Sequence, residues 1–283
     1  MIFHLTSPVN ASDIAGLLCQ PFLPDDFPIK RVTAFADLRS SALSFAPHCN
    51  FQPPKNSLVI TSGPCEYAGN TLLSANPRLD FIRVLHWLKM NDLLPPCGPG
   101  HIDASAEIHP SAIIEAGATI GKECRIGAHS HIRSWVVLGH HVTVGSQVSL
   151  GHDGFGFERE PNGTPVRFPH LGRVIIGDHV EIGNLCAISR GNLANTEIQD
   201  HVKIDDQAYI AHNAMVCEQA MLMSGVRLNG RTRIGKGCWI GTGAMIKEGQ
   251  TVGDHAVVGM GSVVLDHVAP DTTVAGNPAR KIG

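Results

Sequence analysis

Aliphatic residues recur at every sixth position over most of the chain. One series runs without a miss from Ile102 to Leu150, and a second runs from Ile198 to Val264. Between them the same spacing holds over Ile176, Ile182 and Ile188. A period of six matches neither the 3.6-residue period of a helix nor the alternation of a single strand. It predicts short strands joined by turns.

The other positions of each hexad are also restricted. The residue two before the aliphatic is mostly small or β-branched, and glycine often follows the aliphatic, as at residues 120–121 and 240–241. Three hexads per coil would point every aliphatic side chain inward, onto the coil below. The hexads then make eight coils, a column of about 38 Å at the spacing of paired strands. Cys124, Cys186 and Cys238 occupy the small position, which predicts packing residues.

The first hundred residues and the interruptions follow other patterns. Residues 57–61 predict a strand, and residues 76–94 predict a helix with Asn76 as N-cap and Pro77 at its first position. Residues 151–173 break the hexads with aromatic, charged and proline residues, which is typical of a functional loop. We expect a small α/β domain at 1–98, a mainly β domain of hexapeptide repeats at 99–267 with 151–173 inserted, and a tail at 268–283.

Composition and charge narrow the function classes. Hydrophobic residues make up 43% and charged residues 17%, which excludes intrinsic disorder, and 30 glycines are too few for collagen. A net charge of −3 gives no cationic field for nucleic acid or anionic membranes. No apolar run approaches the ~18 residues of a membrane span, and no Cys or His spacing suits a metal. We expect a cytoplasmic protein without a metal or stable membrane insertion.

Three segments carry a specific resemblance: GHDGFGF at 151–157, VIIGDHVEIG at 174–183 and VKIDDQAYIAHN at 202–213. They resemble the UDP-3-O-acylglucosamine N-acyltransferases of lipid A and lipopolysaccharide biosynthesis. Residues 43–51 and 70–85 are similar to that family's uridine-binding domain. The resemblance implies a left-handed parallel β-helix, a homotrimer with sites between subunits, and no tightly bound cofactor. It also implies acyl transfer from acyl-CoA or acyl carrier protein to the amino group of a UDP-linked sugar.

Site residues follow from the same resemblance. It makes His212 the general base and Asp205 a second catalytic residue. It assigns the substrate to Phe45 and Phe51 around the uracil, Asp153, Phe155 and Phe157 in the loop, and Asn213. A histidine, with an ordinary pKa of about 6.5, can accept the proton that an amine loses on attacking a thioester. Spacing alone does not choose His212, since His140 and His152 also lie two residues after a core aliphatic.

Two departures from the family keep alternatives open. The family's second active-site histidine has no counterpart in residues 245–249, which read MIKEG. Residues 274–280, VAGNPAR, resemble the terminal loop of acetyl-CoA-dependent hexapeptide acetyltransferases and make Arg280 a candidate contact for the donor. The first alternative is therefore an acetyl-CoA-dependent O- or N-acetyltransferase of another nucleotide sugar for surface polysaccharide. The second is a non-catalytic trimeric β-helix that only binds.

Overall fold

The computed structural model describes residues 2–20, 26–46, 53–63 and 71–282. The contacts divide the chain into two units, Met1–Pro96 with Gly156–Pro169, and Cys97–Phe155 with His170–Gly283. The expected boundary near residue 98 is close to this division, but the middle of the insertion packs with the first unit. Among the described residues, no helix is both long and apolar enough to span a bilayer.

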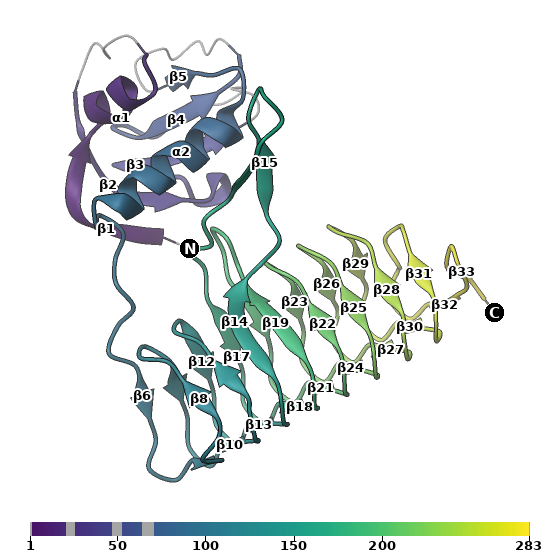
Figure 1. The fold of residues 1–283 in the computed structure, drawn as a ribbon. Helices are drawn as coiled ribbons and strands as arrows, with labels where there is room; N and C mark the ends of the chain where they lie inside the picture. The colour runs from purple at the N-terminus through teal and green to yellow at the C-terminus, as the bar shows by residue number, and fades with distance from the viewer. Residues whose placement is uncertain (1, 21–25, 47–52, 64–70, 283) are drawn as a thin grey trace. The chain divides into compact units, whose positions relative to one another are not determined.

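In its described residues, the first unit contains a five-stranded sheet, with strand order β1-β2-β3-β4-β5, and two α-helices (Figure 1). β1 and β2 are antiparallel, whereas the pairs from β2 to β5 are parallel. The predicted strand at 57–61 is confirmed as β4. The elements are β1 (Ile2–Asn10), α1 (Ala11–Leu17), β2 (Pro28–Thr33), a 3₁₀ turn (Phe35–Asp37), β3 (Ala42–Ala46), β4 (Leu58–Thr61), β5 (Thr71–Leu73) and α2 (Pro77–Met90).

Helix α2 confirms the N-terminal signals read from the sequence. Asn76 Oδ1 accepts a hydrogen bond from the Leu79 N–H at 3.1 Å, and Pro77 is the first helical residue. Phe81 and Leu85 are fully buried on the face toward the sheet. The helix ends at Met90 rather than at residue 94, because Asp92 adopts a left-handed backbone conformation with φ of 55°.

The central part of the insertion forms a hairpin of β15 (Phe157–Arg159) and β16 (Pro165–Arg167). This hairpin is tied to α2 by ion pairs from Arg83 to Glu160 and from Arg78 to Glu158, the latter at 3.5 Å. The buried Phe168 ring lies 6.1 Å from that of Phe81. These contacts explain why residues 156–169 belong to the first unit.

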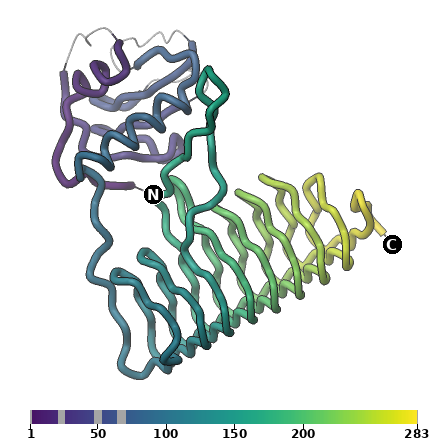
Figure 2. Tube along the Cα trace, viewed as in Figure 1, coloured from purple at the N-terminus to yellow at the C-terminus, as the bar shows by residue number. Residues whose placement is uncertain are grey.

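The second unit is a parallel β-helix with three faces, each a sheet that receives one strand per coil (Figures 1 and 2). The ten-stranded face consists of β7 (Glu107–Ile108), β10 (Arg125–Ile126), β13 (Thr143–Val144), β18 (Glu181–Ile182), β21 (Lys203–Ile204), β24 (Met221–Leu222), β27 (Trp239–Ile240), β30 (Val257–Val258), β32 (Thr273–Ala275) and β33 (Arg280–Lys281).

The other two faces have eight strands each. The β8–β31 face consists of β8 (Ile113–Ile114), β11 (His131–Ile132), β14 (Ser149–Asp153), β19 (Ala187–Arg190), β22 (Tyr209–Ile210), β25 (Arg227–Leu228), β28 (Met245–Ile246) and β31 (Val263–Val264). The β6–β29 face consists of β6 (His101–Ile102), β9 (Thr119–Ile120), β12 (Val136–Leu138), β17 (Val174–Ile176), β20 (Thr196–Ile198), β23 (Met215–Val216), β26 (Arg233–Ile234) and β29 (Thr251–Val252).

The register places each hexad aliphatic directly over the next, as with Ile126, Val144 and Ile182. All three are buried, so the hexads form the core as predicted. The corner cysteines Cys124 and Cys238 are also buried, and their Sγ atoms donate to backbone carbonyls of Gly139 and Gly253. The fold class expected from the sequence is confirmed.

The final coil does not end in a free tail. β32 joins the ten-stranded face in parallel with β30, and β33 then pairs antiparallel to β32, with Val274 opposite Lys281. Residues 268–283, expected to be a loop leaving the column, therefore add two strands to it.

Candidate functional site

One corner of the β-helix contains the proposed base and its neighbour Asn213. His212 lies between β22 and β23, where the chain turns from the β8–β31 face to the β6–β29 face. The insertion leaves the column between β14 and β17, at the same corner but two coils earlier. The register of β22, β25, β28 and β31 stacks His212, Gly230, Glu248 and Asp266 in one column along this corner. We call this the His212 corner.

Asn213 fixes the tautomer of His212. The Asn213 Nδ2 donates to the Ala194 carbonyl at 3.0 Å, and its Oδ1 accepts the Asn192 N–H at 3.4 Å. Oδ1 is therefore the acceptor toward His212, whose Nδ1 lies 3.0 Å away and must carry the proton. In the neutral imidazole, the Nε2 atom then keeps the lone pair that a general base requires.

The insertion supplies two further neighbours of His212. A Cβ added to Gly154 would lie 2.8 Å from His212 Cδ2 and 2.8 Å from His170 Nε2, so glycine is needed for this close approach. The His170 ring is buried and meets the His212 ring edge-on at 5.6 Å between centroids. His212 is thus packed from one side by the two ends of the insertion.

The other side of His212 packs closely against Gly230. A Cβ at Gly230 would lie 3.0 Å from His212 Nε2 and 3.2 Å from Glu248 Oε1, so a side chain here would displace one of these groups. Glu248 is half-exposed and forms an ion pair with Arg231 at 2.7 Å. Gly230 therefore lets the imidazole and the carboxylate lie close to each other.

The other two histidines considered from spacing have different surroundings. His140 lies at another corner, where its Nδ1 accepts the Lys122 N–H at 3.0 Å. His152 Nε2 lies 3.0 Å from Ser189 Oγ, and burial, with the nearby Arg133 cation, lowers the pKa of His152. Each has a ring nitrogen hydrogen-bonded to a neighbouring coil, whereas His212 bonds through Nδ1 to the adjacent Asn213.

A basic cluster lies on the same corner, toward the N-terminal coils. The Arg173 and Arg190 guanidinium groups lie 5.2 and 5.8 Å from the centre of the Trp135 ring. Arg190 Nε donates to the Gly172 carbonyl at 2.8 Å. Asp153 is paired with Arg190 in the β14–β19 register and is exposed, so its carboxylate counters part of this positive charge.

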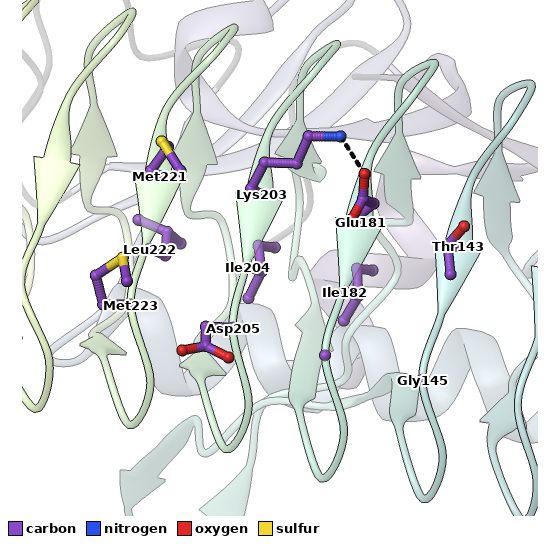
Figure 3. Close-up of a pocket in the computed structure, with 11 residues that line it drawn as sticks. Thr143, Gly145, Glu181, Ile182, Lys203, Ile204, Asp205, Met221, Leu222 and Met223 are labelled. Carbon is purple, nitrogen blue, oxygen red and sulfur yellow. Dashed lines mark hydrogen bonds and ion pairs between the residues drawn. The ribbon is translucent and has the colours of Figure 1, made fainter.

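Asp205 is not beside His212 in the same chain. It follows β21, at the corner where the ten-stranded face turns to the β8–β31 face, and it lines a groove of about 590 Å³ over the ten-stranded face (Figure 3). Met221 and Met223 line the same groove, and the Lys203 Nζ donates to Glu181 at 2.6 Å beside it. One whole face separates the two predicted catalytic residues within a subunit.

The predicted aromatic contacts each have their own surroundings. Phe45, half-buried on β3, packs on Phe81 with 4.9 Å between ring centroids. Phe155 is 84% exposed and follows β14, and Phe157 lies under the Arg167 guanidinium at 4.5 Å. Phe51 lies outside the described residues.

Arg280 lies on β33, at the end of the column. Its side chain is 67% exposed, and Nη1 donates to the Ala279 carbonyl at 2.9 Å. The Asp266 carboxylate of the His212 corner is 4.0 Å away. The guanidinium is therefore available to an anionic ligand.

Sequence reasoning missed Gly154, His170, Gly230 and Glu248 as neighbours of His212. The register offered a signal for two of them, because one coil spans 18 residues and places Gly230 and Glu248 above His212. His170 had no such signal, since its position depends on how the insertion returns. Within the described ranges, no group of three or more His, Cys, Asp or Glu side chains could hold a metal ion.

Comparison with known proteins supports the resemblance. Residues 117–152 and 231–266 match the family model described as bacterial transferase hexapeptide (six repeats). A UDP-3-O-acylglucosamine N-acyltransferase from Coxiella burnetii (strain Dugway 5J108-111) is 34% identical over 173 residues, 48% of each chain. One from Delftia acidovorans is 33% identical over 204 residues, 64% of this chain and 59% of that protein. The chain spans about half the length of the curated relatives it matches, and the resemblance read from its motifs is confirmed.

A solved structure agrees at the level of the fold. The UDP-N-acetylglucosamine acyltransferase from Campylobacter jejuni superimposes with a TM-score of 0.53 at 22% identity, covering 65% of this chain and 74% of that one. This likeness shows a shared β-helix.

Proposed function

We propose that this protein is an acyltransferase that moves an acyl group from a phosphopantetheine thioester to the amino group of a UDP-linked amino sugar. The names of its relatives support this activity, as does the hexapeptide repeat. The observation that carries the proposal is the hydrogen bond between His212 Nδ1 and Asn213 Oδ1, because it leaves Nε2, on the Gly230 side of the ring, as the nitrogen that can accept a proton.

In the proposed reaction, His212 Nε2 accepts a proton from the acceptor nitrogen as that nitrogen attacks the thioester carbonyl. The same proton can then pass to the departing sulfur. A positioned base of this kind contributes about 10²–10⁴-fold to a rate. The donor is acyl-CoA or an acyl carrier protein, and no tightly bound cofactor takes part.

Asp205 enters this proposal only in an oligomer. Since Asp205 and His212 lie at different corners of one subunit, they can share a site when the groove of one subunit faces the His212 corner of the next. A homotrimer with three such interfaces satisfies this requirement, because closed rings repeat one heterologous contact. We propose further that Phe45, with Phe51, binds the uracil ring.

The test is acyl transfer with UDP-amino sugars and a panel of acyl-CoA and acyl carrier protein donors, with products identified by mass spectrometry. We expect transfer to nitrogen by the wild-type protein and a loss of about 10²-fold or more in His212→Ala. His140→Ala is the matched control and should keep its activity. Full activity in His212→Ala would reject the base, and no transfer to any amine would reject the function.

An acetyl-CoA-dependent acetyltransferase of another nucleotide sugar is the second candidate. The exposed Arg280 on the terminal hairpin favours it, since guanidinium groups bind phosphates well. In the same assay, preference for acetyl-CoA over long-chain donors, weakened by Arg280→Ala, would select this candidate.

A further inference from the structure

The surroundings of His212 Nε2 have a chemical asymmetry that concerns the acceptor. His212 Nε2 and Glu248 Oε1 would lie 3.0 and 3.2 Å from a Cβ at Gly230, so both groups border the same point. Because residue 230 is glycine, no side chain separates the imidazole from the carboxylate. A donor nitrogen that approaches them from solvent would meet a proton acceptor and a negative charge together.

We propose that Glu248 binds the acceptor nitrogen in its ammonium form, and so directs this site to amines rather than hydroxyls. The inference rests on the proposed acyltransferase function and adds a residue that selects its substrate. An amine with a pKa near that of an α-amino group, about 7.7–8.0, is largely protonated at neutral pH. An ammonium has three donors, enough to reach both the carboxylate and His212 Nε2.

A hydroxyl acceptor gains little from the same carboxylate. It carries no charge, and the negative charge of Glu248 would oppose the alkoxide character that a hydroxyl develops as it loses its proton. Hydrogen bonds between charged groups are also stronger than those of neutral donors. The Glu248 carboxylate therefore favours amine acceptors over hydroxyl acceptors through its charge.

The reaction balances with His212 as the only base. His212 Nε2 takes one proton from the ammonium and releases it to solvent, which frees the nitrogen lone pair. The nitrogen forms the C–N bond with the thioester carbonyl, and its second proton passes through His212 to sulfur as the C–S bond breaks. The products are an amide, a thiol and one proton in solution.

The ion pair to Arg231 holds Glu248 in position. Arg231 Nη2 lies 2.7 Å from Oε1, and both side chains are about half-exposed, so the pair orients the carboxylate more than it stabilises the fold. The other charged groups near Glu248 along the chain and the column are Lys247, Asp266 and, on protonation, His212. A substitution that removes only the charge of Glu248 tests its role directly.

The experiment compares Glu248→Gln with wild type in binding and in turnover. Calorimetry without an acyl donor should show that Glu248→Gln binds a UDP-amino sugar at least about tenfold more weakly, whereas binding of the matching UDP-N-acetyl sugar stays within about twofold. In turnover, the rise in KM should be largest near pH 6 and should shrink above pH 8, where the amine is already neutral.

Glu218→Gln is the matched control, because Glu218 forms a comparable exposed ion pair with Lys236 at 2.9 Å on another corner. It should change neither measurement, and thermal unfolding should confirm that both variants fold. Gly230→Ala gives a second arm, since its Cβ would displace the His212 or Glu248 side chain and should weaken binding of both sugars.

Equal binding of the amino sugar by Glu248→Gln and wild type would overturn the inference. So would a rise in KM that does not depend on pH. If the wild-type protein transfers acyl groups and either result is found, Glu248 loses its role while the proposed function stands. If the wild-type protein transfers to no amine, the proposed function itself fails, and the inference with it.

Discussion

Asn213 holds a backbone conformation that few side chains adopt, with φ of 60°. Asparagine is one of the residues that tolerate this left-handed region. From that position its amide reaches Ala194 in the preceding coil and His212 beside it. One residue therefore closes the turn and sets the tautomer of the proposed base.

Replacing Asn213 with glycine separates its role in the turn from its role in orienting His212. Glycine keeps the left-handed backbone but removes the acceptor for His212 Nδ1. We expect kcat/KM to fall about tenfold or more, because His212 can then rotate and exchange tautomers. Thermal unfolding should show a cooperative transition at a modestly lower temperature. Unchanged kcat/KM in this variant would mean that Asn213 does not orient the base.

At the residue scale, only the resemblance to the acyltransferase family singled out His212 as the candidate base. His140, His152 and His212 share one position in the hexad, and their differences come from partners in other coils. Ser189 lies 37 residues after His152, and Ala194 lies 19 residues before Asn213. Those distances depend on the length of the insertion and on the irregular coil at 189–197, which no local pattern specifies.

At the scale of helices and strands, the sequence predicted those elements whose position depends on a local residue pattern. The hexads fixed the strand positions, and the capping of α2 could be read from two residues, Asn76 and Pro77. The hairpin of β15 and β16 could not be assigned to its unit, because ion pairs and aromatic contacts with α2 hold it there. Such contacts join segments about 80 residues apart.

The corner cysteines give a prediction about pH. Burial raises the pKa of Cys186 and Cys238 to about 11, and their thiols donate to backbone carbonyls. In the unfolded chain a thiol ionises near pH 8.5, so the folded state loses relative stability as pH rises from about 9 to 11. Below pH 8.5 this contribution is fully present.

The wild-type protein is compared with a double variant that carries Cys186→Ala and Cys238→Ala. Alanine suits these positions because it already occupies the same hexad position at residues 208 and 244. Urea unfolding should show that the wild-type midpoint falls more steeply than that of the variant between pH 8 and 10. Parallel slopes in the two proteins would show that these thiols are not the cause.

At the scale of the whole molecule, the separation of Asp205 from His212 makes the proposed trimer testable. Asp205→Ala and His212→Ala homotrimers should each be nearly inactive. When the two are unfolded together and refolded at equal concentration, about a quarter of the interfaces would pair an intact His212 with an intact Asp205. Activity should therefore return to about a quarter of the wild-type level.

The control mixes His212→Ala with the doubly substituted chain, which leaves no interface with both groups and should regain nothing. Sedimentation should show the same trimer in each mixture. If the mixed variants stay inactive while the trimer forms, the two residues do not share a site across subunits.

The antiparallel hairpin at the end of the column has a consequence for association between molecules. A stack of parallel rungs offers its last strand as a template, and another chain could extend the ten-stranded face by adding to it. In this chain the outermost strand is β33, which reverses direction and carries Arg280 and Lys281 in exposed positions. A strand from another molecule would have to pair with an edge that runs antiparallel to the rest of the face, beside two adjacent cations. End-to-end growth into fibres is therefore disfavoured at this face.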